Sequence, residues 1–495
     1  MIKGDKPRRG EGWRGRVAFA GGTDGFAYVP EQVLAVDYRD EILERAREMV
    51  PGLQVEGLAL QNRRMGRITR VPDVPAMVRH LRSFGFQVQP DHVFFAHCGE
   101  GASCCGPHPA VRAACAAGPA ASPVYASPVY ASPVYASPVY ASPVYASPVY
   151  ASPVYASPVY ASPVYASPVY ASPVYASPVY ASTYIATGHR RSSAVPVQPA
   201  DAANVLGRLE HIDEHVEEPS PESPPDVVVL DTGYATDSEL TPTALADLGS
   251  LIAPRDDGPM PVEDRPDVPP DDGLLDPAAG HGTFIAGLVQ QVAPGAKVEL
   301  WRVLHPQGDG TESAIAAAVD ALTDRNADGG AVLNLSFGGY VMEKGEVLSG
   351  AIRAAQAKGY VVVASAGNDG ICRPTYPAVL PDVVSVGAVG PGGPAPFSNY
   401  GPWVRACAPG VDLVSTFFQT FDGIEEPDGP HDYDPDHFQG WARWSGTSFA
   451  APIVAGAIAH HARTHHVPVA TAVERVVDDP LLLRIADLGT VVNLI

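Results

Sequence analysis

The sequence contains no apolar run that approaches the length of a membrane span. A helix that crosses a bilayer needs about 18 or more consecutive apolar residues, so no membrane partner is expected. Six cysteines in 495 residues do not make a disulfide scaffold. Basic residues are also scarce, and the formal net charge is -22. A nucleic acid is therefore disfavoured as a partner, because phosphate binding requires a basic surface.

No secretory signal is visible at the start of the sequence. Residues 1–16 are polar and basic, and the apolar stretch Val17-Ala18-Phe19-Ala20 that follows is too short for the apolar region of a signal peptide. The cytoplasm is thus the expected compartment, with secretion as the alternative. We expect a disordered basic tail at residues 1–16 and an α+β domain at 17–96. A linker is expected at 97–224, followed by a larger α/β domain at 225–495.

Residues 17–96 predict a small α+β domain of the ferredoxin-like type. Asp73 is the expected N-cap of its second helix. The strands are expected at 28–35, 53–60 and 86–95, the last one broken at Pro90, and the helices at 40–50 and 73–84. One face of the second helix carries apolar residues at helical spacing, namely Val74, Met77, Val78, Leu81 and Phe84.

The linker begins with four cysteines and two histidines, but no Cys-x-x-Cys pair occurs among them. A metal site is therefore the less favoured interpretation. Residues 121–180 are twelve perfect copies of Ala-Ser-Pro-Val-Tyr. Proline at every fifth position blocks both helix and strand pairing, which predicts an extended, disordered spacer. A tyrosine-bearing interaction tract is the alternative.

From residue 225 onward, short apolar strands alternate with helices, which is typical of an α/β domain with a mostly parallel sheet. Strands are expected at 227–230, 296–304, 331–335, 361–364 and 383–388, and helices at 282–292, 312–323 and 455–462. Sheets of this kind place their sites at the carboxyl ends of the strands. Asp231, residues 334–339 and Asn368 fall at such ends.

Three residues in this region suit serine-based acyl transfer. That chemistry needs a hydroxyl to attack, an imidazole to take its proton, and a carboxylate to hold the imidazole. Asp231 ends an apolar strand, while His281 and Ser448 begin helices. Each also has a structural explanation, since Asp-Thr-Gly often forms a turn and Ser often caps a helix. Only their joint occurrence favours a catalytic site.

Residues 224–495 closely resemble the subtilisin-like (S8) serine peptidases. The likeness is carried by Asp231-Thr232-Gly233, His281-Gly282-Thr283, Ala366-Gly367-Asn368 and Gly446-Thr447-Ser448. It implies a three-layer α/β domain in which Asp231 orients His281. It also makes His281 the general base and then the general acid, Ser448 the nucleophile, and the Asn368 amide an oxyanion donor. The order Asp, His, Ser and the oxyanion amide are those of subtilisin itself, so these roles are carried over.

The resemblance also implies where a substrate lies. Residues 303–310 look like the strand that pairs with substrate, and residues 335–339 look like the opposite wall. A protein or peptide substrate would lie extended between them, held by main-chain hydrogen bonds. The substrate-binding residues implied are Gly308, Gly310, Ser336, Phe337 and Gly338. Phe449 and Ile453 stand where the family often has Met and His, at positions to which we assign no chemistry.

No cofactor is required by this chemistry, and no metal ligands are assigned. The acidic loops 255–276 and 422–436 suit either calcium or solvent. Solvated loops are favoured because EF-hand-like spacing is absent. Cys372 and Cys407 can pair only in an oxidising compartment.

Residues 17–96 resemble, more weakly, the propeptide of the same family, through residues 28–34 and 89–93. This implies an inhibitor tethered to its own enzyme. Residues 1–115 hold 16 lysine and arginine against 13 aspartate and glutamate residues, and their opposite charge to the remainder favours docking. We therefore expect a serine endopeptidase restrained by its N-terminal domain. A catalytically silent scaffold or binding protein, and a peptide ligase or cyclase using the same triad, are the alternatives.

Overall fold

The structure, a computed structural model, describes residues 17–20, 25–58, 65–96, 194–197, 224–234, 252–255, 260–261, 263–266, 273, 275–325, 330–342, 345–419, 421–423 and 437–492. All of them belong to one compact unit, formed by Glu11–Ala110 and Arg190–Ile495. The expectations for the basic tail, the linker cysteines and the repeats lie outside the described residues. No helix in the described ranges is long and apolar enough to span a bilayer.

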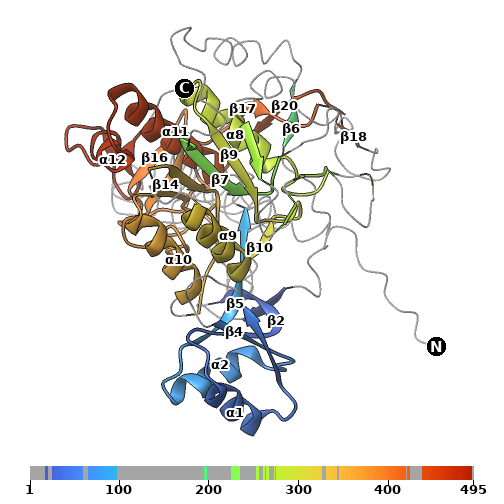
Figure 1. The fold of residues 1–495 in the computed structure, drawn as a ribbon. Coiled ribbons are helices and arrows are strands. Elements are labelled where there is room, and N and C mark those ends of the chain that lie inside the picture. Colours follow the sequence, from blue (N-terminus) through green and yellow to red (C-terminus); the bar gives the residue numbers. More distant parts are fainter. Residues whose placement is uncertain are drawn as a thin grey trace, which may run out of the picture. The chain divides into compact units, whose positions relative to one another are not determined.

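Residues 17–96, here called the N-terminal module, form an antiparallel sheet with two helices (Figure 1). The elements are β1 (Ala18–Ala20), β2 (Phe26–Ala35), α1 (Asp40–Met49), β3 (Gln54–Leu58), β4 (Met65–Thr69), α2 (Val74–Ser83) and β5 (Val88–Ala96). The strand order is β5-β2-β4-β3. From β2 onward the succession is β-α-β-β-α-β, the order of a ferredoxin-like sheet.

One face of this sheet packs against α1 and α2, and the other packs against the C-terminal part of the chain. This is possible because successive side chains of a strand point to opposite sides. Val33 and Ile68 pack in one cluster with the buried residues of α1 and α2. Leu34 and Phe94 belong instead to the large core formed by residues after 224. The second helix begins as expected, since the Asp73 carboxylate accepts a hydrogen bond from the Ala76 N–H at 2.9 Å.

Two expectations for this module are wrong in detail. Pro90 does not break its strand. It lies inside β5 opposite Val33, and the register shift is in β2, between Tyr28 and Val33. The irregularity in pairing is therefore a bulge in the partner strand β2, and β5 itself stays continuous. Phe84 does not join the buried face of α2, because it follows the last residue of that helix and is 49% exposed.

Residues 224–492, here called the C-terminal module, are built on a ten-stranded sheet. Its strands are β7 (Val227–Asp231), β8 (Ile252–Arg255), β9 (Val298–Arg302), β11 (Val332–Leu335), β13 (Val361–Ser365), β14 (Val384–Gly390), β15 (Gly393–Pro394), β16 (Ala406–Pro409), β21 (Arg484–Ile485) and β22 (Gly489–Val491). The order is β21-β22-β16-β14-β13-β11-β7-β9-β8, with β15 beside β14. Every pair from β22 to β8 is parallel, so the predicted mostly parallel sheet is confirmed.

Helices lie on both faces of this sheet. They are α8 (His281–Val292), α9 (Glu312–Arg325), α10 (Glu346–Ala357), α11 (Thr447–His465) and α12 (Val469–Val476). On one face α8 packs against α11, and on the other α9 packs against α10. The predicted three-layer α/β fold is present.

The remaining strands are short. They are β6 (Val195–Pro196), β10 (Asp309–Thr311), β12 (Phe337–Gly338), β17 (Leu413–Thr416), β18 (Phe421–Asp422), β19 (His437–Phe438) and β20 (Trp441–Trp444). β10 and β12 both pair with β5 of the N-terminal module. The chain leaves β7 toward β8 and leaves β11 in the opposite direction, toward β13. The carboxyl ends of β7 and β11 are therefore a switch point, where α/β sheets place their sites.

Candidate active site

Asp231 and His281 meet at the switch point. Asp231 is the last residue of β7, and His281 is the first residue of α8. The His281 Nδ1 lies 2.7 Å from the Asp231 Oδ1, and both side chains are buried. Since the carboxylate oxygen also accepts the Thr232 N–H at 2.8 Å, the proton of the imidazole is assigned to Nδ1. Nε2 is then a proton acceptor, and no described residue hydrogen-bonds to it.

The close approach of the two motifs depends on a glycine. A Cβ atom on Gly282 would lie 2.3 Å from the carbonyl oxygen of Gly233. Any larger residue would push the start of α8 away from the end of β7, and the bond between His281 and Asp231 would lengthen. This is a physical reason for glycine beside the histidine.

Ser448 is the second residue of α11 and is fully buried. Its hydroxyl donates to the Ser336 carbonyl oxygen at 2.7 Å, and the Ser336 hydroxyl donates to the Ser448 carbonyl oxygen at 2.7 Å. That carbonyl is available because Pro452, four residues on, has no N–H with which to close the helical bond. The end of β11 and the start of α11 are thereby tied together.

No hydrogen bond joins Ser448 to His281 within the described part of the chain, since Nε2 has no partner there. The hydroxyl would have to turn about its Cα–Cβ bond, away from Ser336, to reach the imidazole. Catalytic hydrogen bonds often form only once substrate is bound. The structure thus brings together the segments that carry the three predicted residues but holds the serine hydroxyl on another acceptor.

Asn368 follows β13 and is held by the residue before Ser448. Its Oδ1 accepts hydrogen bonds from the Thr447 N–H at 3.0 Å and the Thr447 hydroxyl at 2.8 Å. Nδ2 is buried, with no partner among the described residues. An amide fixed through its oxygen keeps its NH₂ group available as a donor, which is the property that an oxyanion site needs.

Asp264 is a site neighbour that the sequence patterns do not reveal. Its Oδ2 accepts from the Thr232 hydroxyl and from the Gly280 N–H, both at 2.8 Å. The Thr232 hydroxyl in turn accepts from the Gly282 N–H at 3.1 Å. This network joins the segments that carry Asp231 and His281. Burial raises the pKa of Asp264 to about 7.

The acidic loop 255–276 is thus not solvated throughout, because Asp264 and Asp276 are buried. Most of that loop and nearly all of 422–436 lie outside the described residues. Within the described ranges no group of three or more His, Cys, Asp or Glu could hold a metal ion. Cys372 and Cys407 are free thiols, the first exposed and the second buried.

Aromatic rings surround the imidazole. The ring centroid of His281 lies 5.1 Å from that of Phe449 and 5.6 Å from that of Trp444. An apolar, water-poor surrounding strengthens the electrostatic interactions inside it. Phe449, to which we assigned no chemistry, therefore contacts the predicted base directly.

The predicted substrate-binding residues lie along β5. The Ala96 N–H donates to the Gly308 carbonyl oxygen at 2.9 Å. β5 runs antiparallel to both β10 and β12, and it pairs Phe94 with Gly310, Phe95 with Asp309 and Gly338, and Ala96 with Phe337. A segment of the chain itself thus occupies the track assigned to substrate. One step further in this register lies Ser336, the acceptor of the Ser448 hydroxyl.

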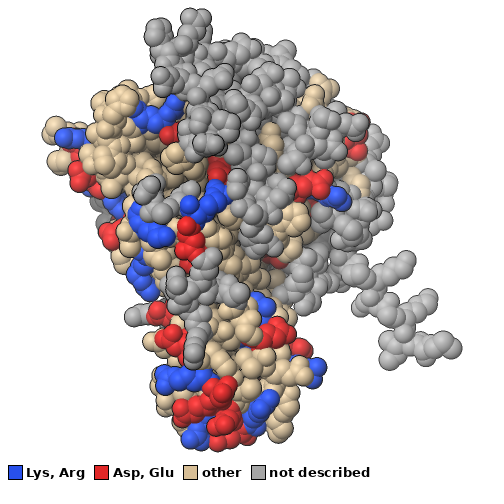
Figure 2. All heavy atoms as spheres, in the orientation of Figure 1, with Lys and Arg blue, Asp and Glu red and all other residues tan. Residues whose placement is uncertain are grey.

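The side chain of Phe94 is buried in an aromatic pocket on this track. Its ring centroid lies 6.5 Å from that of Phe337 and 6.2 Å from that of Tyr376, with interplanar angles of 30° and 16°. Apolar burial, main-chain pairing and buried side-chain hydrogen bonds such as that between His92 and Glu312 join the two modules. The ion pairs of Arg45 and Arg67 lie within residues 17–96. In Figure 2 both signs of charge intermingle on the end that carries α1 and α2.

Comparison with known proteins finds relatives of the C-terminal module. The model of the subtilase family (Peptidase_S8) matches residues 225–471. The thermophilic serine proteinase of Bacillus sp. (strain AK1) is 35% identical over 211 residues, 40% of this chain and 47% of that protein. Thermitase of Thermoactinomyces vulgaris is 35% identical over 188 residues, which are 36% of this chain and 59% of that protein.

Subtilisin DY of Bacillus licheniformis is 34% identical over 195 residues, 36% of this chain and 62% of that protein. The chain therefore spans from about half to three fifths of the length of these relatives. The crystal structure of a cold adapted subtilisin-like serine proteinase is similar with a TM-score of 0.39 and 25% identity, covering 58% of this chain and 97% of that one.

Proposed function

The chain belongs to the subtilase family through residues 225–471, and from this premise we propose that it is a serine endopeptidase restrained by its own N-terminal module. The observation that carries the proposal is the position of β5. It is an extended peptide paired on both sides, one register step from the residue that holds the Ser448 hydroxyl.

In the proposed reaction, the Ser448 hydroxyl breaks its hydrogen bond with the Ser336 carbonyl oxygen and attacks the carbonyl carbon of the substrate. His281 takes the proton at Nε2, while Asp231 holds Nδ1–H and stabilises the imidazolium. The oxyanion is held by the Asn368 amide and the Ser448 N–H. His281 then protonates the leaving amine, and water releases the acyl group by the same steps in reverse. The distances that support this are the 2.7 Å bond of His281 and the Thr447 bonds that orient Asn368.

Peptidase activity is restrained because β5 occupies the track assigned to substrate. While β5 lies between β10 and β12, no other peptide can pair with either strand. A substrate in the same register presents, opposite Ser336, the residue that follows the position of Ala96. Counted along the chain, that residue is His97. We expect the first self-cleavage at the bond between His97 and Cys98.

Two measurements test the proposal. A fluorophosphonate probe should label Ser448 in the purified chain and fail on Ser448→Ala, and intact mass should show a fragment of residues 1–97. A folded chain that hydrolyses nothing and takes up no probe after removal of the N-terminal module would be a silent scaffold. The probe would label a ligase or cyclase equally well. Analysis of the peptide products therefore separates these activities from hydrolysis.

A further inference from the structure

Glu312, the first residue of α9, is a buried carboxylate beside the proposed substrate track. Its Oε1 accepts the Leu348 N–H from the start of α10 at 3.0 Å. Its Oε2 accepts two side-chain donors from β5, Gln89 Nε2 at 2.7 Å and His92 Nδ1 at 2.5 Å. Its side chain is fully buried in this arrangement.

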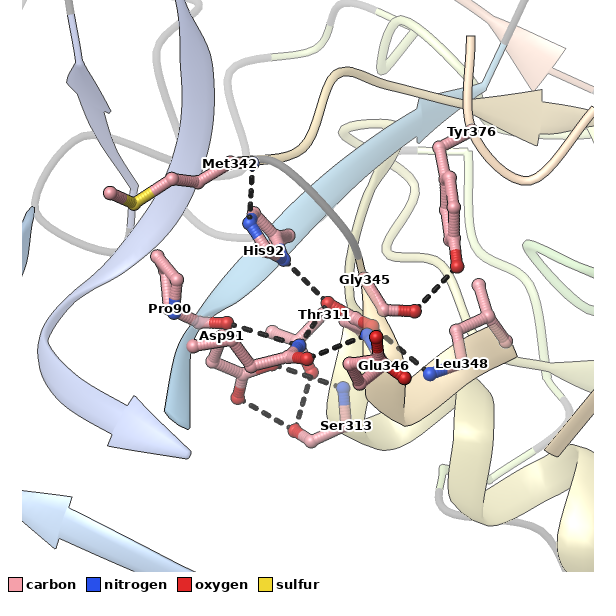
Figure 3. Close-up of polar contacts among 12 residues, drawn as sticks. Pro90, Asp91, His92, Thr311, Ser313, Met342, Gly345, Glu346, Leu348 and Tyr376 are labelled. Carbon is pink, nitrogen blue, oxygen red and sulfur yellow. Dashed lines mark hydrogen bonds and ion pairs between the residues drawn. The ribbon is translucent and has the colours of Figure 1, made fainter. Parts of the chain in front are cut away.

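The bonding of His92 shows which partner donates. Its Nε2 accepts the Met342 N–H at 3.0 Å (Figure 3), so this nitrogen carries no proton. The proton is therefore on Nδ1 and is directed to Glu312. The carboxylate is held by donors only, as an ionised acceptor requires.

The register fixes where Glu312 meets a substrate. Thr311 pairs with Val93, and Glu312 follows Thr311, so the side chain that reaches it comes from the residue before Val93. In a substrate that continues this register to Ser336, that position is the sixth residue before the bond to be cut.

When the N-terminal module leaves, Oε1 keeps the Leu348 N–H, but Oε2 loses both of its side-chain donors. No lysine or arginine in the described part of the C-terminal module forms an ion pair with Glu312. An incoming side chain that donates a hydrogen bond or carries positive charge would replace His92, whereas an acidic one would be repelled.

We propose that Glu312 is a specificity-determining residue, which selects a cationic or hydrogen-bond-donating side chain at the sixth residue before the scissile bond. This rests on the proposed peptidase function and on the register of β5. It extends substrate recognition beyond the aromatic pocket that holds Phe94.

The test uses the self-processed full chain, with active sites counted by a fluorophosphonate. Quenched peptides carry the sequence of residues 91–97 before the scissile bond and differ only at the position of His92, which is replaced by Lys, Leu or Glu. We expect kcat/KM for the His and Lys peptides to exceed that for the Leu peptide by about tenfold, mainly through KM, and the Glu peptide to be the poorest substrate.

Glu312→Gln keeps an oxygen for the Leu348 N–H and removes the charge, so the preference should fall to within about twofold. Glu346→Gln is the matched control, because Glu346 begins α10 and its side chain is partly exposed beside Arg353. It should keep the preference. Equal rates for all four peptides with the wild-type chain would overturn the inference while leaving the peptidase intact. Failure to cut any peptide would overturn the proposed function as well.

Discussion

Replacing Asp264 with asparagine should make the stability of the folded chain less dependent on pH. Asp264 accepts two hydrogen bonds through Oδ2, and its other oxygen is buried without a described partner. An asparagine can keep both bonds through its single amide oxygen. The substitution therefore removes a titrating group and preserves the network that joins Thr232 to the start of α8.

The magnitude follows from the shift in pKa. Burial raises the pKa of Asp264 from 3.8 to about 7. Between these values the folded chain holds a proton that the unfolded chain has released, so the free energy of unfolding falls as pH rises, and it levels off above about 7. Each pH unit is worth about 1.4 kcal/mol. From pH 5 to pH 8 the wild-type chain should lose about 3 kcal/mol that the Asp264→Asn variant keeps.

The assay is urea unfolding at pH 5 and pH 8, in a Ser448→Ala background that prevents self-digestion. Comparing variant with parent cancels other titrations, including that of Asp91, whose pKa burial raises to about 6. Asp264→Ala separates charge from bonding. It should be destabilised at pH 5 by roughly 1–3 kcal/mol for each of the two donors left without an acceptor. A difference between Asp264→Asn and the parent that is the same at both pH values would refute the reasoning.

Three further outcomes are expected. His281→Ala should lower peptide hydrolysis by about a million-fold, the loss known for the corresponding histidine of subtilisin, while the chain still folds; equal hydrolysis by both proteins would remove the assigned role. Asn368→Leu should lower kcat by about 100- to 1,000-fold, again the value for subtilisin's own amide, and a change in KM alone would contradict an oxyanion role. Phe94→Ala in an added fragment of residues 1–115 should weaken inhibition of the processed enzyme by about 100-fold or more. Phe84→Ala, at an exposed ring, should leave inhibition unchanged, and equal inhibition by both variants would exclude the aromatic pocket as an anchor.

Most of the architecture could be predicted from local pattern. Apolar runs such as that of β7 and the amphipathic spacing of α2 are properties of a few adjacent residues, and each favours one element. The motifs around Asp231, His281 and Ser448 are equally local. Pro90 shows the limit of such reasoning, because whether a proline interrupts a strand depends on the strand beside it. Here β2 bulges and β5 continues.

The sequence by itself determined the α/β succession, the N-cap at Asp73, and which residue types were present for serine chemistry. Only the tertiary structure decided that Asp264 is buried against Thr232, and that Glu312 lies against His92, 220 positions earlier in the chain. Contacts between distant segments depend on strand register and on how two faces pack. Neither is encoded in the spacing of neighbouring residues, whereas helix and strand periods are.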